Sequence, residues 1–253
     1  MTADLPALSP EESARYEWQM WSPNVGLEGQ RKLKGTSVLI SRIGGVGGTV
    51  AYYLAAAGIG RLILAHAGNI RPDDLNRQLL MTTDGIGQLR IESAKRRLRE
   101  LNPHVDLVGV GENISENNVG DLVAQADLIV DAAPLFAERF LMNRESVRQR
   151  RPLIEAAMYD FEGQVATFLP GKTACLACLY PEPPPYWKRE FPVFGAVSGA
   201  VAAIAAVEVI KLVTGVGDTL AGSMLRIDLR SPEFRRLPIL RDAECAVCGE
   251  SGV

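Results

Sequence analysis

The residues whose spacing points most directly to chemistry are four cysteines, arranged in two Cys-x-x-Cys pairs. The first pair is Cys175 and Cys178, and the second is Cys245 and Cys248. Each such turn presents two thiolates at about the edge length of a ZnS4 tetrahedron, so the two pairs predict a zinc site. Four thiolates leave no open coordination position, and the predicted zinc is therefore structural. Disulfides or a redox pair are the alternatives, which a cytoplasmic location disfavours.

A glycine-rich turn within VLISRIGGVGG is the second stretch with chemical potential. An apolar segment leads into Gly44, Gly45 and Gly47, an Ala-rich helix follows, and a second apolar segment ends at His66. Such units bind nucleotides because the turn lets phosphates approach backbone N–H groups at a helix N-terminus. A glycine usually opens the turn and an acidic residue usually ends the second strand, yet Arg42 and His66 occupy those places. The alternative is that the glycines only let the helix pack closely on the sheet.

Alternating strands and helices extend from this turn to about residue 150. The pattern predicts an open, mostly parallel sheet with helices on both faces, a Rossmann-like doubly wound α/β fold. The expected strands are 36–40, 61–65, 105–110 and 127–132, and the expected helices are 46–57, 85–101, 116–124 and 136–149.

The flanking segments predict additions to this core. A helix is expected over 10–34, two short strands meet at DFEG after residue 150, and a proline-rich crossover follows at 180–192. An apolar helix and a late antiparallel strand pair, GSMLRIDLR with EFRRLPIL, complete the chain. We therefore expect a single domain over 1–253, made of an N-terminal helical segment (1–34), a nucleotide-binding-like core (35–170) and a zinc-stapled C-terminal part (171–253).

Composition excludes several classes of protein. The chain has 253 residues, is 47% hydrophobic and 23% charged, and carries a net charge of −3. That balance is typical of a globular protein and gives no bulk attraction to nucleic acid or to an anionic membrane. The longest apolar run, 193–207, falls short of the roughly 20 residues that span a bilayer, and the N-terminus has no signal-peptide pattern. We expect a cytoplasmic protein.

Taken together, these residues resemble the ThiF/MoeB/HesA family, the bacterial relatives of ubiquitin-activating enzymes. The resemblance covers roughly residues 9–250. It rests on RYEWQ, GLEGQRKLKGTSVLI, the Gly44-Gly45-Val46-Gly47 turn, LNRQ, GIGQLRIESAKRRLRELNP, FEGQVATFLPG, both cysteine pairs and AAVEVIKLVTG. It implies ATP binding at the turn, transfer of AMP to the C-terminal glycine of a ubiquitin-like sulfur carrier, a homodimer, and zinc on the two cysteine pairs.

The resemblance also implies which residues carry that chemistry, and this sequence departs from the family at several of them. The departures are Trp18 for an arginine that reaches across the dimer, Arg42 for the first glycine, His66 and Gly68 for two aspartates, Arg90 for a lysine, and Pro134 for a magnesium-binding aspartate. We expect His66 to be a surface residue at a strand end. The positions that retain nucleotide- or anion-binding types are Gly44, Gly45, Gly47, Asn76, Arg77, Arg90 and Asp131.

These departures favour a catalytically degenerate family member, in which ATP and magnesium binding are doubtful. Such a protein would recognise a carrier tail or another anion, with Arg42, Arg77 and Arg90 as candidate ligands, or pair with an active paralogue. The alternative is a working ATP-dependent adenylyltransferase with non-standard residues, in which acidic roles pass to Asp131, Asp73, Asp74 or Glu155. A nicotinamide-dependent oxidoreductase is disfavoured, because it needs the acidic residue that His66 replaces.

Overall fold

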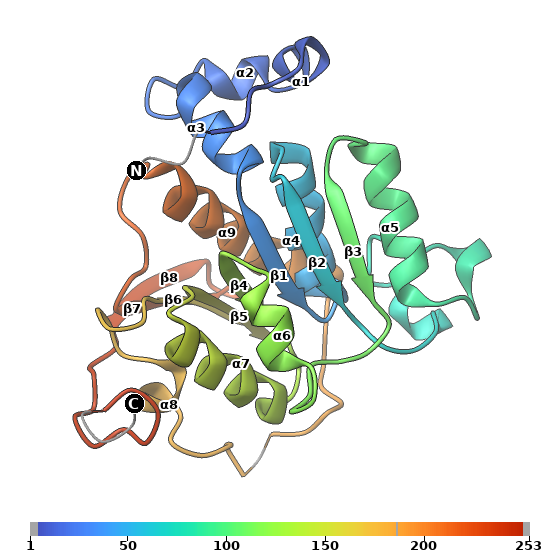
Figure 1. Ribbon diagram of the computed structural model, residues 1–253. Coiled ribbons are helices and arrows are strands. Elements are labelled where there is room, and N and C mark those ends of the chain that lie inside the picture. The colour runs from blue at the N-terminus through green and yellow to red at the C-terminus, as the bar shows by residue number, and fades with distance from the viewer. Residues whose placement is uncertain (1–4, 186, 250–253) are drawn as a thin grey trace.

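The computed structural model describes residues 5–185 and 187–249, and its centre is an eight-stranded mixed sheet (Figure 1). The strand order is β3-β2-β1-β4-β5-β6-β7-β8. In that order the first five strands, β3, β2, β1, β4 and β5, run parallel to one another. Strands β5, β6, β7 and β8 then pair antiparallel, each with the next. The strands are β1 Ser37–Ser41, β2 Arg61–Ala65, β3 Asp106–Val110, β4 Leu128–Asp131, β5 Leu153–Tyr159, β6 Glu162–Phe168, β7 Ser223–Asp228 and β8 Glu233–Pro238.

Helices cover both faces of this sheet, which confirms the predicted doubly wound fold. Alternate residues of β1 point to opposite faces, so Val38 and Ile40 join one buried cluster while Leu39 joins the other. On the first face pack α4 Gly45–Ala57, α5 Arg90–Leu101 and α9 Gly195–Thr214. On the second lie α6 Val119–Ala124, α7 Phe136–Gln149 and α8 Leu176–Leu179.

The segment 10–34 is helical, as predicted, but it forms three helices instead of one long helix. They are α1 Pro10–Arg15, α2 Glu17–Met20 and α3 Gly26–Lys34. Ser9 caps α1 as its sequence indicates, by accepting a hydrogen bond from the Glu12 N–H at 3.2 Å. Pro23 lies in the turn before α3, where its missing N–H and its ring oppose helix continuation.

The predicted helix 85–101 starts later than its sequence pattern indicates. A short 3-10 helix at Thr83–Gly85 comes first, Gly87 then adopts a left-handed backbone with φ of 85°, and α5 begins at Arg90. Another 3-10 helix, Pro72–Asp74, follows the loop after β2. The turn at Pro72–Asp74 places Asp73 and Asp74 in the wall of a cavity at the end of the sheet.

Helix α9 is longer than the apolar run 193–207 that marks it in the sequence. By length and composition alone its 20 residues are apolar enough to cross a membrane. It packs, however, on α4 and on strands β5 and β6. Its buried Glu208 pairs with Lys211 and accepts hydrogen bonds from the Thr167 hydroxyl at 2.8 Å and the Leu220 N–H at 2.7 Å. These partners make α9 a core helix of the fold.

Candidate functional site

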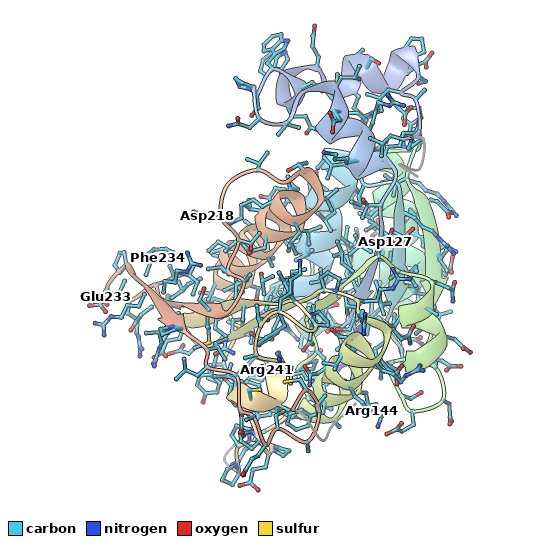
Figure 2. All side chains as sticks on the ribbon, turned by 60° about the vertical axis from the view of Figure 1, so that its left-hand side comes forward. Asp127, Arg144, Asp218, Glu233, Phe234 and Arg241 are labelled. Carbon is cyan, nitrogen blue, oxygen red and sulfur yellow. The ribbon has the colours of Figure 1, made fainter. Side chains whose placement is uncertain are left out.

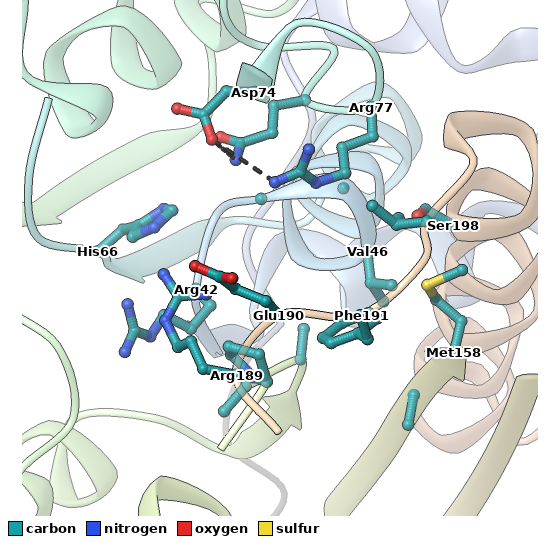
Figure 3. A pocket seen from close by; sticks show the side chains of 18 of the residues that line it. Arg42, Val46, His66, Asp74, Arg77, Met158, Arg189, Glu190, Phe191 and Ser198 are labelled. Atoms are coloured by element: carbon teal, nitrogen blue, oxygen red, sulfur yellow. Dashed lines mark hydrogen bonds and ion pairs between the residues drawn. The ribbon is translucent and has the colours of Figure 1, made fainter. Parts of the chain in front are cut away.

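A cavity of about 590 Å³ lies where the loops after β1, β2 and β4 meet the crossover (Figure 3). The ends of parallel strands and the N-terminus of α4 surround it, which is the usual ligand position in a doubly wound sheet. Of the sequence-predicted positions, it brings together Arg42, Gly44, Gly45, His66, Asn76, Arg77, Arg90 and Pro134. Trp18, Gly47, Gly68 and Asp131 are not among its lining residues.

Arg42 opens the glycine-rich turn with a left-handed backbone, φ 59°. A non-glycine residue held in that region costs about 1–3 kcal/mol. Its guanidinium forms a bidentate pair with Glu138 of α7, in which Nε donates to Oε2 at 2.8 Å and Nη2 pairs with Oε1. Both side chains are largely buried. The pair fixes the turn and leaves no free guanidinium at Arg42 to bind an anion together with Arg77 and Arg90.

The glycines of the turn have different roles. A Cβ on Gly47 would lie 2.4 Å from the Arg42 carbonyl oxygen, so this glycine lets α4 pack on the turn. A Cβ on Gly45 would meet Ser198 of α9 at 2.9 Å. Gly44 has the most room, because the nearest atom belongs to Gln78 at 3.8 Å. Gly44 and Gly45 line the cavity, while Gly47 serves helix packing.

His66 is buried in the cavity wall, so the predicted surface position is wrong. Its side chain is 7% exposed because β2 is an inner strand, between β3 and β1. Burial, together with the nearby charges of Arg90 and Arg42, lowers the pKa of His66 to about 3. Its Nδ1 has no hydrogen-bond partner within the described residues. The imidazole points toward the interior of the pocket in Figure 3.

Arg77 and Arg90, which follow β2 in the sequence, are held by one buried carboxylate. Arg90 donates from Nε and Nη2 to Asp74 Oδ2 at 3.1 and 2.7 Å. Arg77 approaches the other oxygen at 3.7 Å, and the Gln78 amide donates to that same oxygen at 2.6 Å. Gly68 permits this arrangement, because a Cβ there would lie 2.8 Å from Arg90 Nη1. Both carboxylate oxygens of Asp74 are therefore bonded to side chains that form the cavity wall.

The end of β4 contains a second, fully buried charge cluster. Arg139 pairs with Glu155 and lies 3.5 Å from Asp131 Oδ2. Burial raises the pKa of Asp131, and it raises the pKa of Glu155 to about 7 although Arg139 opposes the shift. Asp131 also accepts a hydrogen bond from the Ala133 N–H at 3.0 Å. Both carboxylates therefore contact Arg139, which lines the cavity, and neither lines that cavity itself.

Pro134 faces the crossover where the family resemblance implies an aspartate. The indole N–H of Trp187 donates to the Pro134 carbonyl at 2.7 Å. The same ring contacts Phe136 and Phe191, with centroids 5.7 and 5.6 Å away. Trp187 also lines a second cavity of about 820 Å³ beneath the crossover. Trp187 therefore lines both cavities and holds the crossover against Pro134 and Phe136.

Sequence reasoning missed several residues of this site: Gln78, Glu138, Arg139, Trp187, Arg189 and Glu190. Glu138 and Arg139 lie in the first turn of a helix just after β4. Charged residues at that place are a signal that points to the strand ends. Trp187 and Arg189 lie in the crossover, where proline composition indicated only a loop.

The four cysteines gather into a cluster that fits a metal. Their sulfur atoms all lie within 4.8 Å of one another, and the Cys175–Cys245 and Cys178–Cys248 pairs are 3.7 and 3.4 Å apart. A tetrahedral zinc thiolate site has sulfur–sulfur edges of about 3.8 Å. Arg241, labelled in Figure 2, donates a hydrogen bond to a backbone carbonyl of this tail. The cluster could therefore hold a metal such as zinc.

Trp18 lies away from the cavity of its own chain. It is 79% exposed and stacks on Trp21 with a centroid distance of 5.8 Å. Arg15, retained from the same motif, donates to the Leu101 carbonyl at 2.9 Å. This segment contributes no side chain to the pocket of the chain that carries it.

Comparison with known proteins supports the resemblance. Residues 16–247 match the ThiF family. The heterocyst protein HesA of Trichormus variabilis is 46% identical over 242 residues, covering 96% of this chain and 91% of HesA. The sulfur carrier protein adenylyltransferase of Thermus thermophilus is 38% identical over 249 residues, covering 95% of this chain and 92% of that protein.

A solved structure agrees with the fold as well. E. coli MccB, crystallised with MccA-N7isoASN, superposes with a TM-score of 0.83 at 27% identity, covering 93% of this chain and 75% of that one. The sequence relatives and the structural neighbour thus both span nearly the whole chain. This chain belongs to the ThiF family.

Proposed function

We propose that this chain binds an anion in its cavity without activating it with ATP, as a degenerate member of its family. The anion is a phosphate group or the C-terminal carboxylate of a ubiquitin-like carrier protein. In this proposal the protein acts in the cytoplasm as a homodimer or beside an active paralogue, with a structural zinc on its cysteines.

The end of β4 is the observation that carries this proposal. Magnesium requires near-octahedral oxygen ligands, usually carboxylates together with substrate phosphates. Pro134 offers no such side chain, and its carbonyl already accepts a hydrogen bond from Trp187. Asp131 is buried against Arg139. Among the described lining residues, Glu190 alone is a carboxylate outside any ion pair. This set of residues does not fit a magnesium–ATP complex.

The charge of the cavity supports anion binding. Six arginines and three acidic residues line it, and five of the arginines are ion-paired, Arg42 and Arg139 with carboxylates outside the lining. Among the described lining residues Arg189 is the arginine outside any ion pair, and His66 is neutral at physiological pH because its pKa lies near 3. The N-terminus of α4 opens into it at Gly44 and Gly45, and no side chain caps that helix. Unpaired N–H groups at a helix N-terminus attract anions.

A working adenylyltransferase is the alternative. The observation in its favour is the retained cavity of about 590 Å³, lined by Asn76 and Arg77. The 38% identical T. thermophilus relative is an adenylyltransferase by name. Both functions use the same pocket, so only a reaction measurement separates them.

The decisive experiment is ATP–pyrophosphate exchange with zinc-loaded protein, with and without carrier proteins. Loss of a single positioned electrostatic group commonly costs about a hundredfold in rate. Because several groups differ, we expect exchange more than ~1,000-fold below that of the T. thermophilus enzyme. The matched variant is Arg42→Gly/Glu138→Gln/His66→Asp/Pro134→Asp, in which Glu138→Gln avoids an unpaired buried carboxylate. Exchange by the native protein at the rate of the relative would overturn the proposal.

A further inference from the structure

A buried asparagine of α7 contacts the cysteine cluster. Asn143 is 1% exposed, and its Nδ2 donates a hydrogen bond to Cys175 Sγ at 3.5 Å. Its Oδ1 accepts a hydrogen bond from the Leu176 N–H at 2.9 Å. Because a backbone N–H can only donate, the amide oxygen faces Leu176 and the NH2 group faces the sulfur. One side-chain amide therefore holds both the first cysteine and the first residue of α8.

The four sulfur atoms have few hydrogen-bond donors around them. Among the described residues other than the cysteines, Asn143 is the side chain that donates to one of them, and the Asp242 N–H donates to Cys178 Sγ at 3.5 Å. Four thiolates carry more negative charge than one Zn²⁺ neutralises. A donor to a buried thiolate offsets part of that charge. The amide is thus placed to stabilise the zinc-bound cluster more than the metal-free thiols.

Helix α7 holds this amide in a fixed position. Four residues before Asn143, Arg139 pairs with the buried Glu155. Four residues after it, Val147 packs against the cysteines. Residues four apart lie on the same face of a helix, so one face of α7 is anchored on either side of the amide. The cysteine pair of α8 therefore rests on a rigid element, which is how ligand positions are kept precise.

We propose that Asn143 positions the Cys175–Cys178 turn for zinc and stabilises the zinc-bound thiolates, so that zinc affinity depends on this residue. The inference rests on the proposal that the cysteines hold a structural zinc. The pair on α8 is preformed against α7, and the tail that carries Cys245 and Cys248 completes the site. Hydrogen-bond partners of metal ligands commonly set metal affinity, because they fix the orientation of those ligands.

The test measures the zinc dissociation constant of the native and variant proteins by competition with a chelator of known affinity. Asn143→Leu keeps about the same side-chain volume and removes both hydrogen bonds. We expect it to bind zinc about 10- to 100-fold more weakly. Asn143→Asp retains an oxygen for the Leu176 N–H, but it has no NH2 group and places a negative oxygen beside the sulfur. It should weaken zinc binding at least as much.

Two further readouts separate a role in zinc binding from a role in packing. Zinc should raise the thermal midpoint of Asn143→Leu by less than it raises the native midpoint, because stabilisation by a ligand falls with its affinity. In Co²⁺-substituted protein, the thiolate-to-metal charge-transfer band should shift to longer wavelength, because a hydrogen bond lowers the energy of the sulfur electrons.

Asn102→Leu is the matched control. Asn102 is also fully buried, but it caps the C-terminus of α5, where its Nδ2 donates to the Ala55 carbonyl at 2.7 Å. This helix packs on the opposite face of the sheet from α7 and α8. The control should lower the thermal midpoint equally with and without zinc, and it should leave the zinc affinity and the cobalt spectrum unchanged.

Native zinc affinity in Asn143→Leu overturns the inference, and so does an equal loss of the thermal midpoint with and without zinc. If Asn143→Leu does not fold, Asn143→Asp, which keeps the shape of the residue and the bond to Leu176, decides by the same measurements. A native protein that binds no zinc sinks this inference together with the proposed structural zinc. Zinc bound with unaltered affinity by the variants sinks only this inference, and pyrophosphate exchange tests the proposed lack of activation independently.

Discussion

At the scale of single residues, two buried groups titrate in opposite directions. Glu155 holds its proton up to a pKa of about 7 in the folded protein, while an unfolded glutamate releases it near 4.3. Stability from Glu155 is therefore fully present below about pH 4.3 and is lost as the pH rises through 7. His66, with a pKa of about 3, contributes stability above its unfolded pKa of about 6.5 that is lost as the pH falls. Between about pH 4.3 and 6.5 the two slopes oppose each other.

Removing either group should reveal the pH dependence of stability that the other group contributes. In Glu155→Gln the free energy of unfolding should rise with pH between 4.5 and 6.5 by roughly 2–3 kcal/mol more than in the native protein. His66→Phe should shift the slope the other way, because only the glutamate contribution remains. Urea unfolding at pH 4.5, 5.5 and 6.5 measures both. A native slope in the Glu155→Gln protein would show that Glu155 titrates normally, and the double variant serves as the control.

At this scale the sequence predicts which residues lie at the site, but it does not predict which side chains they contact. The glycine-rich turn located Arg42 and His66 correctly at one end of the sheet. The Arg42–Glu138 pair joins residues 96 positions apart, and the burial of His66 depends on the strand order. Neither property is encoded in local spacing, which predicts an available charge on Arg42 although that charge is paired with Glu138.

At the scale of elements, periodicity predicted regular segments well and interruptions poorly. Strand β2 and helix α7 have the predicted bounds, Arg61–Ala65 and Phe136–Gln149. The N-terminal segment and α5 differ because Pro23 and Gly87 act locally within otherwise helical composition. The crossover reads as a loop in sequence, yet Trp187 docks it on Phe136 and Pro134.

Trp187→Phe should loosen the crossover while leaving its aromatic packing in place. The change removes the indole N–H that Pro134 accepts, and a hydrogen bond of this kind is worth about 0.5–1.5 kcal/mol. Backbone amides of 180–192 should then exchange with deuterium roughly 2- to 10-fold faster, as measured by mass spectrometry of peptic fragments. Trp21→Phe, at an exposed ring in α2–α3, is the control. Unchanged exchange would mean that ring packing alone holds the crossover.

At the scale of the whole molecule, the cysteine cluster joins distant parts of the chain. Cys175 is the N-cap of α8 and Cys178 lies within that helix, while Cys245 and Cys248 follow the sheet edge formed by β8. Figure 1 places this region at the opposite end of the molecule from α1–α3. Sequence spacing was sufficient to predict the cluster, because Cys-x-x-Cys turns fix their own local geometry. Every residue of β8 is exposed. Spacing alone could not predict this, because it depends on the position of β8 at the edge of the sheet.

Loss of one cysteine should release this C-terminal region. Cys245→Ser removes one thiolate of a four-sulfur site, and we expect less than one zinc per chain by atomic emission, against one in the native protein. Structural zinc contributes several kcal/mol, and each kcal/mol lowers the thermal midpoint by about 2–4 °C in a chain of this size. Chelation of the native protein should give the same midpoint, and added zinc should restore it. A native midpoint in the zinc-free variant would contradict a structural role.

The buried pair between Arg42 and Glu138 also has an evolutionary consequence. Replacing Arg42 alone by glycine would relieve the left-handed backbone, but it would strand a carboxylate that is 6% exposed, a loss that commonly costs about 3–5 kcal/mol. Replacing Glu138 alone would strand the guanidinium in the same way. A glycine at position 42 is therefore not reached by one substitution without loss of stability. Positions 42 and 138 should therefore change together among relatives of this chain, because each side chain needs the other as its buried partner.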